Sequence, residues 1–306
     1  TKGDINMEKI NPRVDFAFKK LFGSEENKDI LIDLINSIVS KEDRVKDITL
    51  KNPYNAKNFK SDKLSILDIK AQGENDKWYN IEMQITDQEY FDKRALYYWS
   101  RLYNSQFKSG INYDKLTKTI GINILNFNCL DEKKYHNVYK IKNTINGNIF
   151  LDDLEIHFIE LEKYDEEMSN TLDRWVNFLK KSGMYEEDTV PKELEEVPTI
   201  KKALNLLDTI SLNKEERESY EARLKWLRDE EMALKSAHKK GLEEGIKEGI
   251  KEGIKEGIKE GKKEGILEGK REIARNLLDL LDDKTIALKT GLTKKEIAKL
   301  RKKRVD

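Results

Sequence analysis

The first 165 residues alternate between two spacings of apolar side chains, and this alternation predicts a mixed α/β domain. Residues 26–39 carry apolar side chains three or four positions apart, which is helical spacing. Residues 63–72 and 77–86 are short, apolar-rich and separated by the turn-like sequence GENDK, which predicts a hairpin. One aromatic-rich helix and three further strands are then predicted over residues 89–109, 118–128, 137–142 and 155–161. We therefore expect an α/β fold over residues 8–165.

After this domain the pattern becomes helical, and composition separates three segments. Residues 166–235 predict helices broken by a loop that contains Pro191 and Pro198. In residues 236–270 a glycine recurs at every fourth position among Glu, Lys and Ile. Residues 271–306 predict a basic tail of three short helices. The α/β domain is thus expected to be followed by an all-α C-terminal extension.

The glycine repeat opposes helix formation through its local energetics. Each glycine costs about 1 kcal/mol relative to Ala, so the eight glycines of residues 241–269 cost about 8 kcal/mol. Glu–Lys pairs three residues apart return only about 0.2–0.5 kcal/mol each. The Ile residues beside the glycine row would let a second helix approach closely, whereas a marginal helix would act as a semi-flexible spacer. Both interpretations, an oligomerisation helix and a spacer, follow from the pattern.

Composition narrows the class of protein. Lys+Arg and Asp+Glu each number 58, but residues 285–306 carry eight basic and two acidic residues, a local balance of +6. Cys129 is the single cysteine, which excludes an intrachain disulfide and a cysteine-based zinc site. The chain has no apolar run of 18 residues and no signal-peptide stretch in TKGDINMEKINPR. We therefore expect a cytoplasmic protein with no membrane contact and no organic cofactor.

Two acidic residues stand inside the predicted hairpin. Residues two apart on a strand share a face, so Asp68 lies with Lys70, and Glu82 lies with Gln84. If the register aligns the strands, two carboxylates converge beside a Lys and an amide. Such oxygen ligands hold Mg²⁺ or Mn²⁺, which lower the pKa of a bound water and neutralise charge on a scissile phosphate. The alternative is that both acids are solvated near the turn. Their strand neighbours are apolar, however, which indicates that the strands are buried, and a buried carboxylate needs a compensating partner.

The segment 65–84, SILDIKAQGENDKWYNIEMQ, resembles the active-site hairpin of the PD-(D/E)XK nuclease superfamily. More narrowly, it resembles the recombination-promoting nuclease and transposase family, and the likeness runs in order over about residues 8–180. The other similar segments are DFAFKKLFG at 15–23, the helix and strand of 91–127, EIHFIELEKY at 155–164 and DRWVNFL at 173–179. The resemblance implies a restriction-endonuclease-like mixed sheet flanked by helices. It also implies a metal-dependent DNA endonuclease linked to recombination or mobile-element DNA.

The resemblance further implies roles for single residues. Asp68 and Glu82 would bind the divalent metal, most simply Mg²⁺, with Mn²⁺ or Ca²⁺ as alternatives. Gln84 occupies the third catalytic position, which is usually Lys in the wider superfamily. An amide can orient the attacking water but cannot supply positive charge to the transition state. Lys70, on the face of Asp68, or Arg94, on the following helix, would then supply that charge.

The helix over residues 89–109 carries Lys93, Arg94 and Arg101, which we expect to contact DNA phosphates. Its aromatic residues either stack on unpaired bases or pack in the core, and the helical spacing favours the core. These residues are Tyr90, Phe91, Tyr97, Tyr98, Trp99 and Tyr103. Asp15, on the opening helix, is interpreted either as an extra acid at the site or as a helix N-terminal carboxylate.

The basic tail predicts a trihelical helix-turn-helix whose first helix covers residues 272–281. Gly291 marks the turn, and Thr293 with Glu296 three residues later forms a capping box. The last helix would present basic side chains to DNA phosphates. These residues are Lys294, Lys295, Lys299 and Arg301. The alternative is a small helical cap with a solvated basic end.

Two functions therefore remain open. An active endonuclease would work as a homodimer or higher homo-oligomer, because two sites can cut both DNA strands. A nuclease fold that has lost turnover would instead be a DNA-binding or protein-interaction module. The presence of both Asp68 and Glu82 opposes the second function, whereas Gln84 in place of Lys supports it.

Overall fold

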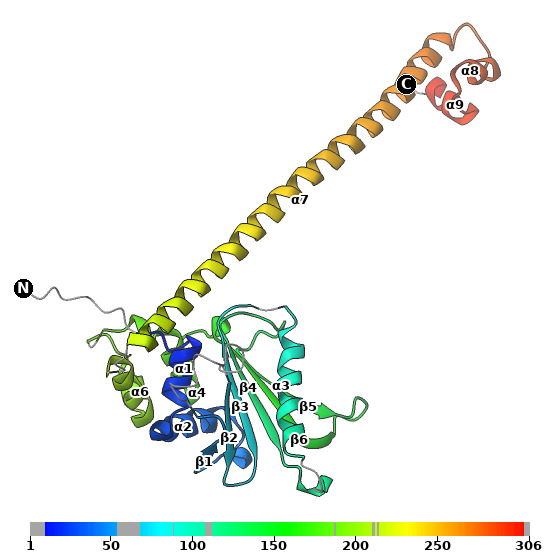
Figure 1. Ribbon diagram of the computed structural model, residues 1–306. Helices are drawn as coiled ribbons and strands as arrows, with labels where there is room; N and C mark the ends of the chain where they lie inside the picture. The colour runs from blue at the N-terminus through cyan, green and yellow to red at the C-terminus, as the bar shows by residue number, and fades with distance from the viewer. Residues whose placement is uncertain are drawn as a thin grey trace, which may run out of the picture. The chain divides into compact units, whose positions relative to one another are not determined.

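A computed structural model describes residues 10–53, 68–87, 89–107, 112–186, 188–209, 212 and 214–302, without the side chains of residues 15, 209, 215 and 219. The chain divides into two compact units, Thr1–Glu231 and Met232–Asp306. The first unit contains a β-sheet and the helices around it, labelled in Figure 1. The second unit contains most of the long helix α7, together with α8 and α9.

Among the residues that the structure describes, the sheet has six strands in the order β1-β2-β3-β4-β6-β5. The strands are β1 (Ile48–Leu50), β2 (Asp68–Gly73), β3 (Trp78–Gln84), β4 (Thr119–Leu125), β5 (His136–Lys142) and β6 (Ile149–Glu160). Strands β3, β4 and β6 run parallel, whereas β1, β2 and β5 pair antiparallel with their neighbours. This mixed sheet confirms the predicted fold class. Strand β6 begins earlier than predicted, and β1 was not predicted.

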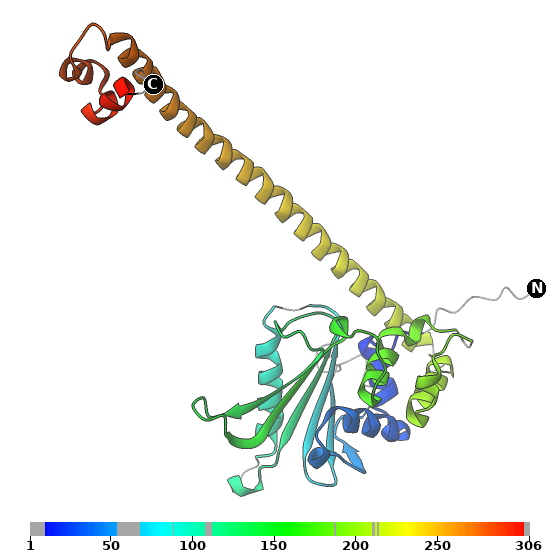
Figure 2. The same cartoon turned by 180° about the vertical axis from the view of Figure 1, so that it is seen from behind.

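Helices cover both faces of the sheet, and Figures 1 and 2 show α3 on the face opposite α1, α2 and α4. The helices of this unit are α1 (Asp15–Phe22), α2 (Lys28–Ile38), α3 (Phe91–Ser105), α4 (Thr171–Lys181), α5 (Lys192–Glu195) and α6 (Pro198–Thr209). Short 3₁₀ turns are η1 (Glu25–Asn27), η2 (Lys41–Asp43), η3 (Tyr113–Lys115), η4 (Leu161–Lys163) and η5 (Ser182–Met184). The sheet thus forms the middle of three layers.

The two faces of the central strands bury different kinds of side chain. On β3, Tyr79, Ile81 and Met83 join the large apolar core that includes α1, α2, α4 and α6. Side chains alternate between faces along a strand, so the intervening polar residues of β3 face α3. A smaller apolar cluster on that side joins α3 to β4 and β6 through residues such as Phe91 and Phe158. Polar side chains of β3 are therefore enclosed beneath α3 instead of being solvated.

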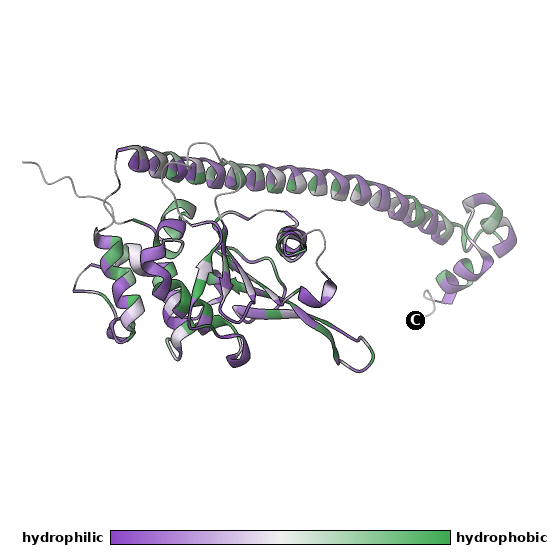
Figure 3. Ribbon diagram, turned by 60° about the horizontal axis from the view of Figure 1, so that its bottom comes forward, coloured by the Kyte–Doolittle hydropathy of each residue, from purple (hydrophilic) through white to green (hydrophobic). Residues whose placement is uncertain are grey.

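Helix α7 (Lys214–Leu277) is continuous through the whole glycine repeat. Its beginning belongs to the first unit, where Tyr220 packs with Val14, Phe16 and Ala17. Figure 3 shows α7 as mainly hydrophilic, with apolar residues recurring along its length. At each glycine of the repeat, no neighbouring atom lies within 4 Å of the position a Cβ would take. Whether this helix pairs with another or acts as a spacer stays a prediction.

The C-terminal tail packs around a small apolar cluster. Ala274 and Leu278 lie at the end of α7 and contact Ile286 of α8 (Asp283–Thr290) and Ile297 of α9 (Lys294–Lys302). The prediction of a separate tail helix over residues 272–281 is therefore wrong, because α7 extends to Leu277 without a break. Over the described ranges, every helix is too short or too polar to cross a membrane.

The turn between α8 and α9 matches its sequence signals. Gly291 adopts φ of 70°, a left-handed conformation that glycine tolerates because it has no Cβ. Glu296 Oε2 accepts a hydrogen bond from Thr293 N at 2.8 Å, and Thr293 Oγ1 accepts one from Glu296 N at 3.3 Å. The predicted capping box is confirmed. In the described part of the second unit, the end of α7 is thus followed by the short helices α8 and α9, which a tight turn joins.

Candidate active site

The candidate site is built on the β2–β3 hairpin. A four-residue turn, Glu74–Lys77, closes it, with Gly73 N donating to Lys77 O at 2.9 Å. The antiparallel register places Asp68 directly opposite Glu82. Directly opposite residues share a face of the sheet, so the two carboxylates converge on the face that α3 covers. The register therefore meets the condition under which the hairpin pattern predicts that the two carboxylates converge.

Glu82 is an enclosed carboxyl with one unmatched oxygen. Its residue is 3% exposed, and Oε1 lies 3.4 Å from Arg94 Nη2 of α3. Oε2 is buried and accepts no hydrogen bond from the described residues. Burial raises the pKa of Glu82 to about 7, with Arg94 opposing the rise and Asp68 adding to it. A buried hydrogen-bond acceptor without a donor lowers the stability of the folded state, so we expect a cation or a proton at this oxygen.

Asp68 and Gln84 border Glu82 in different ways. Asp68 is half-buried, and its Oδ2 lies 3.1 Å from Lys70 Nζ on the same strand face. Gln84 is buried, and its Nε2 lies 3.5 Å from Thr86 O, at the outer limit of a hydrogen bond. Lys70 and Arg94 thus each place a cation beside one carboxylate. The side chain of Asp15 lies outside the described part of the chain.

Two amides at the site were not predicted. Asn80, two residues before Glu82 on β3, is buried, and its Oδ1 has no hydrogen-bond partner among the described residues. Asn123 of β4 stands opposite Glu82 and donates from Nδ2 to His157 O at 3.1 Å. The period-two spacing from Glu82 would have identified Asn80. Asn123 depends on the register of a parallel strand pair, which the sequence does not reveal.

The donor set suits a hard divalent cation. Within the described ranges, no group of three or more His, Cys, Asp or Glu side chains is arranged to hold a metal. A site here would therefore combine two carboxylates, Asp68 and Glu82, with solvent and a substrate oxygen. Mg²⁺ commonly binds in this way, through one or two carboxylates while keeping several waters. The unmatched Glu82 Oε2 fits such an ion.

The predicted DNA-contacting residues of α3 differ in position. Arg94 is half-buried between Glu82 and Tyr98, whose Oη lies 3.4 Å from Arg94 Nη2. Lys93 and Arg101 are exposed on the outer side of the helix. The preference for aromatic residues in the core holds for Phe91 on this helix. It is wrong for Tyr90 and Tyr97, which are 58% and 56% exposed.

The tail residues also differ among themselves. Lys294, Lys295 and Lys299 are exposed on α9. Arg301 instead donates to Asp283 Oδ1 from Nη2 at 2.8 Å and from Nε at 3.1 Å. Its Nη1 also donates to a backbone carbonyl at the end of α7, at 2.8 Å. The Arg301 guanidinium is therefore directed into the tail, whereas the three lysines face solvent.

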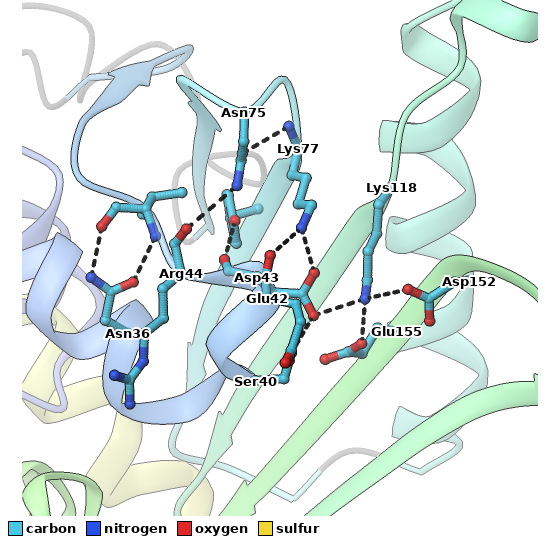
Figure 4. A network of polar contacts seen from close by, with 12 residues as sticks. Asn36, Ser40, Glu42, Asp43, Arg44, Asn75, Lys77, Lys118, Asp152 and Glu155 are labelled. Carbon is cyan, nitrogen blue, oxygen red and sulfur yellow. Dashed lines mark hydrogen bonds and ion pairs between the residues drawn. The ribbon is translucent and has the colours of Figure 1, made fainter.

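A second group of charges, which the sequence did not indicate, lies on the other face of the sheet. Lys118 is 8% exposed, and its Nζ lies 2.9 Å from Asp43 Oδ2 and 2.7 Å from Glu155 Oε2 (Figure 4). Lys77 Nζ also lies 2.8 Å from Asp43 Oδ1. Glu155 alternates along β6 with residues that face α3, so this network points away from the hairpin carboxylates.

Two histidines extend this network. His157 Nε2 lies 2.7 Å from Glu155 Oε1, and His157 Nδ1 lies 2.9 Å from His136 Nε2. Burial would raise the pKa of Glu155, but hydrogen bonds from His157 and two lysines hold it below its usual value. Burial and the neighbouring His157 lower the pKa of His136 to about 4. Lys118 and Lys140 lie within 3 Å of Glu155 Oε2, and Lys118 also lies within 3 Å of Asp43, so the buried carboxylates are paired within the protein, which indicates a structural role.

A mixed sheet flanked by helices, with facing carboxylates on adjacent strands, is the arrangement of a PD-(D/E)XK-type α/β fold. The chain belongs to the PD-(D/E)XK nuclease family transposases, whose family model matches residues 12–237. This match covers the sheet, its helices and the beginning of α7, and it ends before the glycine repeat. Comparisons with curated proteins and with solved structures gave no match. Membership of this family supports a nuclease- or transposase-related function.

Proposed function

We propose that this protein is a divalent-metal-dependent DNA endonuclease that hydrolyses phosphodiester bonds, acting in the cytoplasm on DNA undergoing recombination or mobile-element processing. The observation that carries the proposal is the facing pair Asp68 and Glu82, with a buried Glu82 oxygen that no described group matches. Arg94 pairs with Oε1 alone, and a buried carboxylate oxygen that lacks a partner destabilises the fold. Such a cost is common where a site is built for function.

The roles of the side chains follow from their positions. Asp68 and Glu82 would hold the ion, most simply Mg²⁺, which when bound supplies Lewis acidity and a more acidic water. Arg94 lowers the pKa of Glu82 against the effect of burial and so favours the carboxylate form that binding requires. The Gln84 amide, two residues along the same face, would orient water or a phosphate oxygen. Lys70, 3.1 Å from Asp68, offers the positive charge that Gln84 lacks.

The C-terminal unit would contribute affinity and assembly. Lys294, Lys295 and Lys299 are exposed together on α9 and would bind phosphates without reading the sequence. We propose that α7 pairs with a second copy, because its eight glycines make an isolated helix costly by about 8 kcal/mol. A homodimer would bring two sites to one DNA molecule. Sedimentation of the full chain at several concentrations tests this, and a monomer at every concentration would leave α7 as a spacer.

A second candidate function is a DNA-binding module without turnover. It is supported by Gln84, whose amide lies near Thr86 O of its own chain and carries no charge. The two candidates differ in their dependence on the carboxylates. Cleavage requires Asp68 and Glu82, whereas salt-sensitive DNA binding through lysines does not.

The experiment that separates them is cleavage of supercoiled plasmid in Mg²⁺, Mn²⁺ or Ca²⁺. The wild type is compared with Asp68→Ala, Glu82→Ala and the control Asp131→Ala, which removes an exposed carboxylate outside the sheet. We expect metal-dependent nicking or linearisation by the wild type and the control, and none by the two hairpin variants. DNA binding without cleavage in any metal would overturn the nuclease and leave the binding module. Cleavage that survives both hairpin substitutions would place the site elsewhere.

A further inference from the structure

The outer face of α3 exposes large aromatic side chains that nothing in the described structure covers. Tyr90 is 58% exposed, Tyr97 is 56% exposed, and Leu96 between them is 50% exposed. The inner face of the same helix is fully used, because Phe91 and Ala95 pack into the apolar cluster over β4 and β6. Contiguous exposed aromatic residues on a folded domain commonly mark a binding surface.

Three tyrosine rings at α3 each lie near a cationic side chain, one at its N-cap and two within the helix. Lys93 Nζ lies 4.4 Å from the ring centre of Tyr90. The guanidinium carbons of Arg94 and Arg101 lie 5.5 Å and 5.8 Å from the rings of Tyr98 and Tyr97. We call these six residues the α3 tyrosine–cation row: Tyr90, Lys93, Arg94, Tyr97, Tyr98 and Arg101. At about 100° per residue the five members within the helix, from Lys93 to Arg101, fall within an arc of about 140° and form one stripe, and Tyr90 precedes them as the N-cap residue of α3.

The stripe reaches the candidate active site. Arg94 belongs to the row and also lies 3.4 Å from the Glu82 carboxylate. Within the helix the row runs from Lys93 to Arg101, a separation of eight residues or about 12 Å along the axis. That length spans about three base steps at the 3.4 Å spacing of a stacked strand. A strand lying on the row would therefore pass beside the facing carboxylates.

The chemistry of the row selects its ligand. Small anions would be attracted by three cations but would gain nothing from exposed tyrosine rings. An apolar protein surface would use the rings but would leave Lys93 and Arg101 without an anionic partner, since only Arg94 of the three cations pairs with a carboxylate. A nucleic acid strand with unpaired bases satisfies both, because its phosphates pair with cations and its bases stack on aromatic rings. Bases inside a duplex are stacked on one another and do not offer these faces.

We propose that the α3 tyrosine–cation row binds an unpaired DNA strand next to the hairpin carboxylates, so that the substrate class is single-stranded, branched or locally melted DNA. The binding stands on the row alone, whereas the assignment of a substrate class rests on the proposed nuclease function. The two contacts that define the row, ring stacking and phosphate pairing, do not distinguish one base from another. The preference is thus for an unpaired strand and not for a sequence.

The test compares a (dT)12 oligonucleotide with an abasic 12-mer that carries the same phosphates, in EDTA so that no cleavage occurs. We expect the wild type to bind (dT)12 more tightly, since only this strand offers bases. Tyr97→Ala is expected to weaken (dT)12 binding about 5- to 150-fold and to leave abasic binding unchanged. Tyr97→Phe keeps the ring and is expected to keep the affinity. Lys93→Ala is expected to weaken the binding of both oligonucleotides by the same factor.

Tyr113→Ala is the matched control, because Tyr113 is 78% exposed but lies outside the row. It is expected to bind both strands as the wild type does. Equal wild-type affinity for the two strands, or a Tyr97→Ala loss that is the same on both, would overturn the row as a stacking surface. Tighter binding of (rU)12 than of (dT)12 would overturn DNA as its ligand.

The outcome is separable from that of the plasmid assay. Base-dependent binding in a protein that cleaves neither supercoiled plasmid nor (dT)12 in Mg²⁺, Mn²⁺ or Ca²⁺ would support the row and refute the nuclease. Carboxylate-dependent cleavage in a protein without base-dependent binding would support the nuclease and refute the row.

Discussion

Replacing Glu82 with Gln is expected to stabilise the metal-free protein at high pH, because it removes a buried negative charge. Burial, opposed by Arg94 and aided by Asp68, raises the pKa of Glu82 from 4.5 to about 7. At 1.36 kcal/mol per pKa unit, this rise corresponds to about 3 kcal/mol of unfolding free energy. The size of the effect follows from the 3% exposure of Glu82.

The sign of the pH dependence follows from proton binding. The folded state binds the Glu82 proton more tightly than the unfolded state does. The wild-type stability therefore falls as the pH rises from about 4.5 to about 7, and this contribution stays constant above that range. Gln carries no titrating proton. The advantage of Glu82→Gln over the wild type should grow from below about 1 kcal/mol at pH 5 to about 3 kcal/mol at pH 8.

Urea unfolding of the full chain in EDTA, followed by tryptophan fluorescence at pH 5, 6, 7 and 8, measures this difference. Trp175 is fully buried in the main core and reports its loss. Glu193→Gln, at an exposed position on α5, is the control and should match the wild type at every pH. Adding Mg²⁺ at pH 8 should stabilise the wild type but not Glu82→Gln. A difference between Glu82→Gln and wild type that is the same at pH 5 and pH 8 would refute the reasoning.

Three further predictions concern the rest of the chain. Lys118→Met removes the buried cation between Asp43 and Glu155 and leaves them only their more exposed lysine partners Lys77 and Lys140, so it should cost about 1–3 kcal/mol in urea unfolding. The control Lys115→Met, at a surface pair, should cost less than about 1 kcal/mol. No loss in Lys118→Met would show that the network is not stabilising. Gly253→Ala should stabilise α7 by about 1 kcal/mol in the monomer, because nothing lies within 4 Å of the added Cβ. Thermal unfolding followed by circular dichroism measures this, and a lower midpoint than that of the wild type would contradict it. Lys299→Ala should reduce the slope of log K against log salt for DNA binding by about one, the value for one lost phosphate contact. Arg301→Ala should instead destabilise the tail. Equal effects of the two variants on DNA binding would contradict the different roles assigned to Lys299 and Arg301.

The hairpin and its register were predictable because their signals are local. The turn-like sequence between two apolar segments indicated which strands pair. Because side chains alternate between the two faces of a strand, Asp68 and Glu82 lie on the same face of the paired strands. The beginning of β6 was not predictable in the same way. Its first residues, from Ile149 to Asp153, are largely exposed and pair only with β5, so they lack the apolar pattern of a buried strand.

Other features depend on contacts between distant parts of the chain. Lys118 and Asp43 are 75 residues apart, and each looks like a solvated surface charge when read alone. Tyr97 has the same helical spacing as a core residue, and only the packing of α3 shows which face is covered. The pKa of Glu82 likewise depends on burial beneath a helix that follows it in sequence. These features emerge only from the packing of distant segments.

The four-residue turn of the β2–β3 hairpin also has a consequence for the order of folding. A hairpin can form in about 1–10 μs, whereas the parallel pairing of β3 with β4 must wait for the crossover through α3. In the early hairpin, Asp68 and Glu82 face each other across the strands, and like charges placed directly opposite oppose pairing. Docking of α3 then brings Arg94 to Glu82 and relieves this repulsion. We therefore expect the residues proposed for catalysis to slow the formation of their own hairpin, which becomes stable once the helix that encloses them has docked.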